Sequence, residues 1–426
     1  MNAKLTFLCC LLALGAVQAQ QTYLHCGKLI DCTDKSVKEA MTIVIEGDKI
    51  LELRKGYATA PQGATVIDLK NKTVMPGLMD MHVHIESESS RSSYMERTSL
   101  NDADRAFKSA LYANRNLMAG FTTVRDLGGT GVNVSLRNAI NQGITIGPRI
   151  ITAEKSIATT GGHADPTNGL NRALMGDPGP DEGVINGPDE ARKAVRQRYK
   201  NGADCIKITA TGGVLSVAKD GQGPQFVDEE LEAIVQTAKD YGMHTAAHAH
   251  GTEGMLRAVK AGITSIEHGT MMTPEVMDLM KEKGTYYVPT ISAGIFVAEK
   301  AKEEGYFPRM IVPKALAIGP QIEATFAAAY KAGVKIAFGT DTGVSPHGDN
   351  GKEFIYMVRA GMPAIEAILS ATVTASELIG MNDKLGTIEQ GKLADIIAVE
   401  GDPLANIEAM RKVRFVMKNG VVYKNE

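Results

Sequence analysis

The chain has 426 residues, of which 44% are hydrophobic and 22% charged, and its formal net charge is −3 at pH 7. This length exceeds one minimal domain and suits a large barrel with a smaller partner domain. The composition is that of a globular protein, and the lack of any block of basic residues argues against nucleic acid as a partner.

Residues 1–19 are typical of a secretory signal peptide. Lys4 precedes an apolar stretch, and the segment ends in Val17-Gln18-Ala19, the small-x-small pattern of a cleavage site. The apolar run is too short to remain as a membrane anchor. We therefore expect cleavage after Ala19, export to the periplasm or the cell exterior, and no membrane contact of the mature chain.

Three cysteines follow this segment, namely Cys26, Cys32 and Cys205. Export permits disulfides, so Cys26 could pair with Cys32. Both lie near one strand or its turn, however, and their separation in an extended chain disfavours a bond. Cys205 is typical of a small buried strand residue.

Both ends of the remaining chain are rich in predicted strands. The segments with alternating apolar residues are 22–32, 41–56, 64–69, 386–403 and 413–425. Lys418-Asn419-Gly420 is a hairpin signal within the last of them. We expect one small β-sandwich domain built from both chain ends, residues 20–75 and 384–426.

Residues 76–383 alternate predicted strands with predicted helices. The candidate strands are 77–83, 121–127, 148–154, 204–210, 244–250, 264–269, 286–292 and 335–341. Helical patterns at 102–120, 189–202 and 228–242 open near Asp and close at Gly, as capped helices do. Such alternation predicts an α/β fold, a (β/α)8 TIM barrel. A doubly wound sheet is the alternative, which the lack of a Gly-rich dinucleotide motif after the first strand disfavours.

Histidines, a lysine and an aspartate occur near the ends of five of these strands, where a barrel collects its chemistry. They are His82, His84, Lys207, His248, His268 and Asp341. Side chains two apart on a strand share a face, so His82 and His84 point the same way, as two ligands of one ion do. Each residue alone is commonly structural, and a lysine in an apolar strand is costly to bury unless neutral or modified. Together they predict a metal site.

The segments 74–84 and 386–404 resemble the amidohydrolase superfamily of metal-dependent hydrolases, and the resemblance covers nearly the whole mature chain. It implies two divalent ions, with Lys207 carboxylated and bridging them, since an ammonium group cannot bind a cation. Zinc is the expected metal because imidazole ligands favour it. The implied set is His82 and His84 on the more buried ion, His248 and His268 on the second, and Asp341 at the bridging solvent.

Four further segments, 206–216, 246–251, 265–270 and 339–350, resemble the secreted prolidase-like branch of this superfamily. Its members cleave dipeptides, such as Xaa-Pro or Xaa-Arg, or N-acyl amino acids, and some hydrolyse the amide of ochratoxin. The resemblance thus implies an enzyme that releases a C-terminal amino acid from a dipeptide or other small molecule. A cyclic-amide hydrolase of lactam or imidazolone type is the alternative, although Lys207 argues against the single-metal site usual there. A non-catalytic binding protein is the remote alternative, since none of the six ligands is missing.

Other residues have expected roles around this centre. Asp341 is the expected proton shuttle, and His163 or His250 would bind the substrate carboxylate or polarise the carbonyl. His347 follows the last strand and is equally compatible with a functional or structural role, whereas His244 begins its strand and faces the opposite end. The insert 169–187 is long enough to act as a lid. A barrel of this size could also self-associate.

Overall fold

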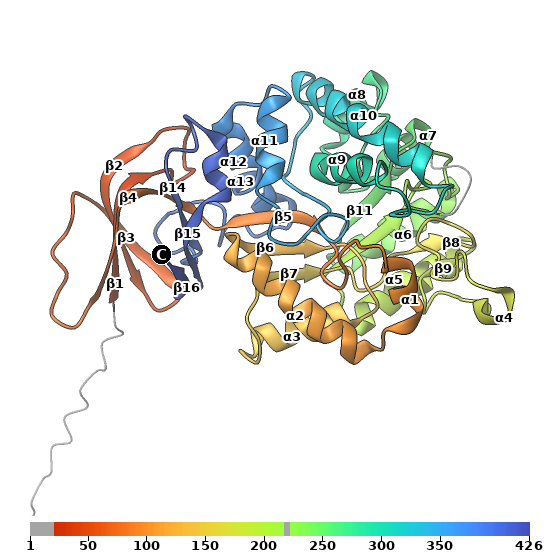
Figure 1. Cartoon of the computed structure of the whole chain (residues 1–426), viewed down its shortest axis with the longest axis horizontal. Helices are drawn as coiled ribbons and strands as arrows, with labels where there is room; N and C mark the ends of the chain where they lie inside the picture. The colour runs from red at the N-terminus through yellow and green to blue at the C-terminus, as the bar shows by residue number, and fades with distance from the viewer. Residues whose placement is uncertain (1–20, 217–221) are drawn as a thin grey trace, which may run out of the picture.

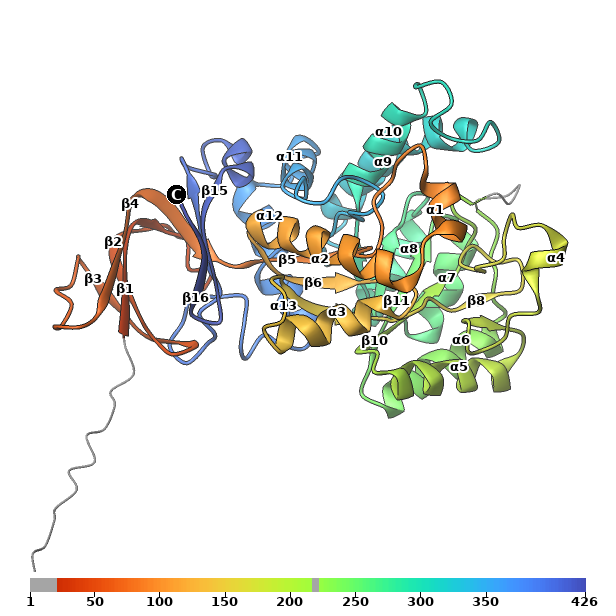
Figure 2. The ribbon, with the colours of Figure 1, turned by 60° about the horizontal axis from the view of Figure 1, so that its bottom comes forward.

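The computed structural model describes residues 21–216 and 222–426. One end of the molecule is a seven-stranded sheet, and the other end alternates strands with helices packed around them (Figure 1, Figure 2). The expected signal peptide, residues 1–19, lies outside the described residues.

Both chain ends contribute strands to the seven-stranded sheet, whose order is β16-β15-β14-β4-β1-β2-β3. Its strands are β1 (Gln21–Leu29), β2 (Lys38–Glu46), β3 (Lys49–Lys55), β4 (Thr65–Pro76), β14 (Ile396–Glu400), β15 (Val413–Lys418) and β16 (Val421–Asn425). β4 joins the two halves, because it pairs in parallel with β1 and antiparallel with β14. The two chain ends therefore meet as expected. In the described residues they form a single sheet, and not the two packed sheets of a sandwich.

The predicted hairpin at the C-terminus is confirmed. β15 pairs antiparallel with β16, and Lys418 faces Val421 across a two-residue turn. The turn residues Asn419 and Gly420 have φ of 49° and 75°. Positive φ at both central residues is what a type I′ turn requires.

The three described cysteines, Cys26, Cys32 and Cys205, are buried and free. Cys26 therefore does not pair with Cys32. Burial raises the pKa of each of the three thiols to about 12, which keeps them protonated. Cys205 lies in a strand, as its sequence context predicted.

Seven of the eight strands expected in the middle of the chain form in two parallel sheets, β5-β6-β7 and β10-β11-β12-β13. They are β5 (Leu78–Val83), β6 (Phe121–Asp126), β7 (Arg149–Thr152), β10 (Cys205–Thr209), β11 (His244–Ala249), β12 (Ser265–His268) and β13 (Tyr286–Val288). An additional short pair, β8 (Ala158–Thr159) and β9 (Val184–Ile185), was not expected.

The eighth predicted strand, residues 335–341, is not a regular strand, and in this respect the sequence prediction is wrong. The segment makes an isolated bridge from Ile336 to Tyr287, and Thr342 just beyond it bridges to Val83. Asp341, the last residue of the segment, has φ of 58°, and this left-handed backbone departs from the extended conformation at that position. The departure falls at a candidate site residue.

Helices occupy the predicted segments as α2 (Asp102–Met118), α5 (Pro188–Asn201) and α6 (Asp228–Asp240). Their aspartates lie in the first turn, where they complement the helix dipole, and the N-cap positions are filled by other residues. The other helices are α1 (Ser93–Ser99), α3 (Val132–Asn141), α4 (Arg172–Met175), α7 (Thr252–Ala261), α8 (Pro274–Lys283), α9 (Ile291–Lys300), α10 (Val312–Lys331), α11 (Lys352–Arg359), α12 (Ala364–Ser370) and α13 (Val373–Leu378). Within residues 21–216 and 222–426, no helix is long and apolar enough to cross a membrane.

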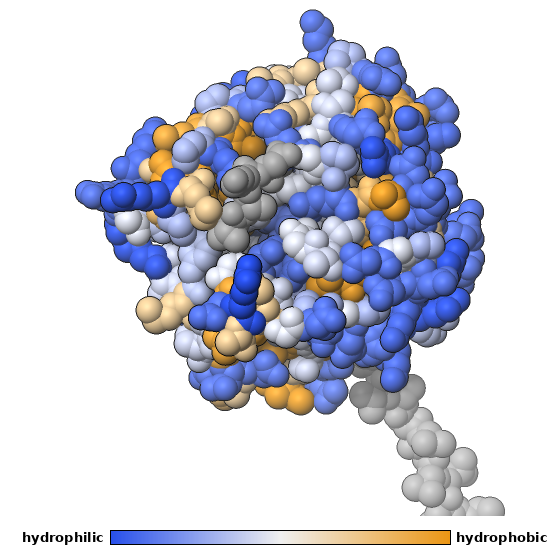
Figure 3. Space-filling model, turned by 90° about the vertical axis from the view of Figure 1, so that its right-hand side faces the viewer, coloured by the Kyte–Doolittle hydropathy of each residue, from blue (hydrophilic) through white to orange (hydrophobic). Residues whose placement is uncertain are grey.

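The face of the molecule opposite the seven-stranded sheet is largely hydrophilic, with apolar residues in separate small patches (Figure 3). The insert 169–187 lies toward this end and carries α4 and β9 (Figure 1). Leu174 on α4 is 72% exposed, so this apolar side chain does not pack against the rest of the described chain. The lid role of the insert stays a prediction.

Candidate metal centre

A single pocket of about 170 Å³ collects the candidate site residues. Most of them lie in, or directly after, the C-terminal halves of parallel strands, which end at the same edge. The candidates that line it are His82, His84, His163, Lys207, His248, His250, His268 and Asp341. Residues as far apart as 82 and 341 are thus brought together.

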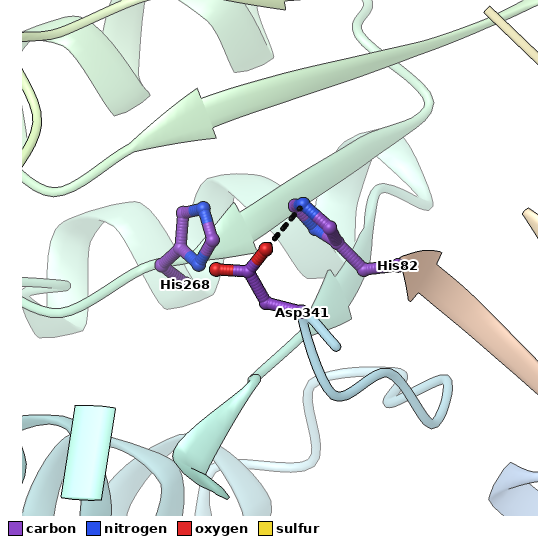
Figure 4. A group of neighbouring side chains, drawn as sticks. All are labelled: His82, His268 and Asp341. Carbon is purple, nitrogen blue, oxygen red and sulfur yellow. Dashed lines mark ion pairs between the residues drawn. The ribbon is translucent and has the colours of Figure 1, made fainter. Parts of the chain in front are cut away.

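Three of these residues form a compact group. His82, His268 and Asp341 are all buried, and each offers one ligand atom within 4.8 Å of the other two (Figure 4). His268 and Asp341 have φ of 69° and 58°, which non-glycine residues adopt rarely and at an energetic cost. Strain of this kind concentrates at functional sites.

The environment of His82 fixes which of its nitrogens can bind a metal. Its Nδ1 donates to Glu267 Oε2 at 2.9 Å, because a carboxylate can only accept. The lone pair is therefore on Nε2, 3.5 Å from Asp341 Oδ1. Neither of these two buried atoms has a hydrogen-bond partner in the described chain.

Backbone and hydroxyl groups orient the other imidazoles. Nδ1 of His84 donates to the Gly128 carbonyl at 3.0 Å, which leaves its Nε2 lone pair 3.4 Å from Asp341 Oδ1. Nε2 of His248 donates to the Gly212 carbonyl at 3.2 Å, so the lone pair of that ring is on Nδ1. Nδ1 of His268 lies 2.7 Å from Thr290 Oγ1. Such outer contacts are those that usually hold metal ligands in place.

Burial sets the charge of the site. It lowers the pKa of His82, His248 and His268 well below the usual value, and that of His84 to about 4, so these rings are neutral near pH 7. Burial also lowers the pKa of Lys207 and raises that of Asp341. Neutral imidazoles beside a carboxylate are the donor chemistry of a divalent metal site, and the unpartnered His82 and Asp341 atoms fit such an ion.

The two candidate substrate-binding histidines also face this pocket. The His163 ring lies 4.4 Å from that of His248, centroid to centroid, and its Nδ1 is buried without a partner in the described residues. A Cβ at Gly213 would lie 2.2 Å from the His163 ring, so only glycine leaves room for it there. His250 Nδ1 lies 2.7 Å from Thr270 Oγ1.

His347 does not line this pocket. Its Nε2 donates to the Ser87 carbonyl at 2.8 Å, its Nδ1 accepts from Asn116 Nδ2 at 3.1 Å, and its ring stacks on Tyr112. Of the two roles expected for His347, functional and structural, these contacts favour the structural one. His244 begins β11 and is likewise absent from the residues that line the pocket.

Sequence reasoning missed the residues that support the candidate ligands. Glu267 pairs with Arg125 at 2.9 Å as well as with His82, and Asp80 accepts from Thr340 Oγ1 and Asn350 Nδ2 at 2.6 and 2.7 Å. The available signal was charge inside otherwise apolar strands: Asp80, Arg125 and Glu267 have no exposed surface. Their partners lie in distant segments, so the sequence alone did not show which groups they would pair with.

Comparison with known proteins identifies the class to which this fold and site correspond. The profile of the amidohydrolase family matches residues 73–423, and the chain belongs to this family. Its similarities lie in the prolidase-like branch, and they indicate a hydrolase of amide or peptide C–N bonds.

Three relatives support this assignment. A solved Xaa-Pro dipeptidase with bound methionine in the active site is 55% identical, with a TM-score of 0.93 over 95% of this chain and 100% of that one. Ochratoxinase of Aspergillus niger is 33% identical over 428 residues, which cover 96% of this chain and 87% of the relative. A prolidase solved with N-methylphosphonate-L-proline is 31% identical, with a TM-score of 0.88 over 96% of this chain and 100% of that one.

Proposed function

We propose that the protein is a binuclear metal-dependent amidohydrolase that cleaves dipeptides or N-acyl amino acids and releases the C-terminal amino acid. The observation that carries the proposal is the pocket that gathers six potential ligands and two further histidines. The names of the relatives agree with it: one is a Xaa-Pro dipeptidase and another an ochratoxinase, so ochratoxin-type amides are included.

The scaffold of this site is, in our proposal, a closed (β/α)8 barrel over residues 76–383. Three isolated parallel bridges support closure: Ile157 with Ile208, Tyr287 with Ile336, and Val83 with Thr342. The last two connect β13 and β5 to the irregular eighth segment, and the first connects β10 to the residue just before β8. In addition, the Asp204 amide, just before β10, donates to the carbonyl of Thr152 at the end of β7 at 2.7 Å. Residues 20–75 and 384–426 would then form the smaller second domain, which carries the seven-stranded sheet.

The residues that would hold two divalent ions, with zinc the metal expected, are His82, His84, Lys207, His248, His268 and Asp341. Lys207 is 3% exposed and lines the pocket beside Asp341. An ammonium group there would repel cations, whereas a carboxylated lysine supplies two anionic oxygens. This chemistry supports carboxylation of Lys207.

The bound ions would lower the pKa of water and polarise the amide carbonyl. Asp341 would take the proton of the attacking water on its carboxylate and pass it to the leaving amine. Its buried position beside His82 and His84 suits this role, because it faces the pocket. His163 and His250 would bind the substrate carboxylate or the carbonyl oxygen.

Metal removal and restoration on a substrate panel test the proposal. The purified protein is incubated with dipeptides, N-acyl amino acids, ochratoxin A and cyclic amides, and products are identified by mass spectrometry. Release of a free amino acid that stops on chelation and returns with zinc is the expected result. Ring opening of cyclic amides without a second product would favour the lactam alternative, and turnover that survives full chelation would exclude a metal mechanism.

A further inference from the structure

We propose that the pocket selects substrates with an apolar, uncharged side chain on one of the two residues that flank the scissile amide. The inference rests on the proposed function and narrows its substrate class. It comes from the part of the pocket wall that is formed by residues other than the metal-ligand candidates.

Two packed helices, α9 and α10, supply this wall. Ala293, Val297, Ile318 and Ile322 line the pocket and are at most 7% exposed. Ala293 and Val297 are four residues apart on α9, and Ile318 and Ile322 are four apart on α10, so each pair presents one helix face to the pocket. Four apolar side chains from two adjacent helices thus line the pocket.

Residues from two loops extend the same surface. Val214, Leu215 and Val344 line the pocket and pack with Val297 and Ile318 in one hydrophobic cluster. The wall is therefore tied to a larger apolar core and is not a set of isolated side chains. A ligand group that enters this part of the pocket exchanges water for apolar contacts.

Glycine at position 294 shapes the wall. Gly294 lines the pocket, and a Cβ there would lie 2.8 Å from Ile322 Cγ2. On α10, a Cβ at Gly319 would lie 3.2 Å from Ala298 Cβ. Small residues at both positions let the two helices approach closely and keep the space in front of Ile322 open.

The described residues that line the pocket carry only two charged groups, Lys207 and Asp341, and both are candidate metal ligands. Nearby Lys314 does not line the pocket and donates to the carbonyls of Ser216 and Gly213 at 2.7 and 3.3 Å. A substrate ammonium, guanidinium or carboxylate against Ala293, Val297, Ile318 and Ile322 would therefore meet no charged partner among these four described wall residues, and burying such a group unpaired is strongly unfavourable. Basic and acidic side chains should be rejected.

A matched dipeptide series tests this specificity. Ala-Xaa and Xaa-Ala are compared with Xaa as Ala, Leu, Met, Phe, Lys, Arg, Asp and Glu, and kcat/KM is measured for each. At one of the two positions we expect Leu, Met or Phe to exceed Ala by roughly 10–200-fold, the range for a methylene in an apolar pocket. The charged residues should fall below Ala at that position.

Variants in the wall distinguish pocket chemistry from general damage. Ile318→Ala should reduce kcat/KM for Leu and Met substrates by a larger factor than for Ala–Ala. Ile318→Glu should raise the relative kcat/KM for Lys and Arg at the same position, since it supplies their missing partner. Leu316→Ala, at an exposed position of α10 away from the pocket, is the matched control and should leave the ranking unchanged.

The outcomes separate this inference from the proposed function. Hydrolysis of dipeptides with a flat ranking, or with charged residues preferred at both positions, would overturn the inference and leave the proposed function intact. An unaltered wild-type ranking in both Ile318 variants would also overturn it. Absence of hydrolysis of every dipeptide and N-acyl amino acid would overturn both.

Discussion

Glu267 Oε2 accepts a hydrogen bond from His82 Nδ1 at 2.9 Å, across two strands that lie in different sheets. The other oxygen of Glu267 accepts from Arg125 Nη2 at 2.9 Å. Neither Glu267 nor Arg125 has exposed surface, so the ion pair is fully buried. The carboxylate of Glu267 therefore fixes the proton of His82 on Nδ1, and it also holds the buried guanidinium of Arg125 in place.

Glu267→Gln should weaken metal binding by roughly 10–100-fold, the usual effect of losing an outer partner of a ligating histidine. The amide no longer compensates Arg125, so the thermal midpoint should fall as well. Competition with a chromogenic zinc chelator measures the first effect and calorimetry the second. Glu253→Gln, on the exposed face of α7, is the control, and an identical zinc affinity in both variants would contradict the role of Glu267.

Much of the candidate site was predictable because strands alternate their side chains. His82 and His84 share a face through this rule, and both line the pocket. Glu267 also lies inside a predicted strand, but its partner His82 is 185 residues away in sequence. Nothing in a single sequence encodes such a pairing, so the supporting residues were not foreseen.

The fold was predicted best where local patterns are strong. Helix α6 fills a segment with an acidic first turn and a clear apolar face, and its bounds agree with the pattern. Residues 335–341 have an equally strand-like composition but form no regular strand. The left-handed backbone of Asp341 depends on the residues around it, which is a tertiary effect that composition does not reveal.

Lys207→Ala should lose metal and activity together. Wild-type protein is expected to carry close to two divalent ions per chain, and the variant clearly fewer, because the bridging oxygens are gone. Elemental analysis measures the metal, and a dipeptide assay the activity. Added short carboxylates should restore part of both; full activity in the variant, or one ion per fully active wild-type chain, would exclude a bridging carboxylated lysine.

Acid should destabilise the metal-free protein through its buried histidines. Burial lowers the pKa of His347 from 6.5 to about 4, so between these values the unfolded chain binds a proton that the folded chain does not. This contribution is complete above pH 6.5 and is lost as the pH falls to about 4.

His347→Gln should therefore flatten the dependence of unfolding free energy on pH. The wild type should lose up to about 3 kcal/mol more than the variant between pH 7 and pH 4, at roughly 1.4 kcal/mol for each unit of pKa difference. Urea denaturation of both metal-free proteins across this range measures it. Parallel curves for the two proteins would mean that the neutral state of His347 does not contribute to the pH dependence of the unfolding free energy.

We propose that the protein is exported, and this proposal predicts a mature chain that begins at Gln20. The signal-peptide pattern of residues 1–19 is the basis for this expectation. N-terminal sequencing of protein isolated from its native host, after separation of cytoplasmic and exported fractions, measures the start directly. An intact Met1 in the cytoplasmic fraction would rule out the signal peptide.

Variants of Asp341 and His250 should separate effects on metal binding from effects on substrate binding. Asp341→Asn keeps the size of the side chain and some ligation but removes the base, so metal content should fall modestly. Turnover should drop by roughly 10²–10⁴-fold, the usual contribution of a positioned general base. Elemental analysis and kcat together report this division.

His250→Ala should behave differently, because its Nδ1 lies against Thr270 and its ring faces the pocket next to His248. If His250 binds the substrate carboxylate, the variant should raise KM for substrates with a free C-terminus and leave bound metal unchanged. Amidated substrates, which lack that carboxylate, should show a much smaller change in KM. Equal metal loss in Asp341→Asn and His250→Ala would instead assign His250, and not His248, as the ligand from this strand.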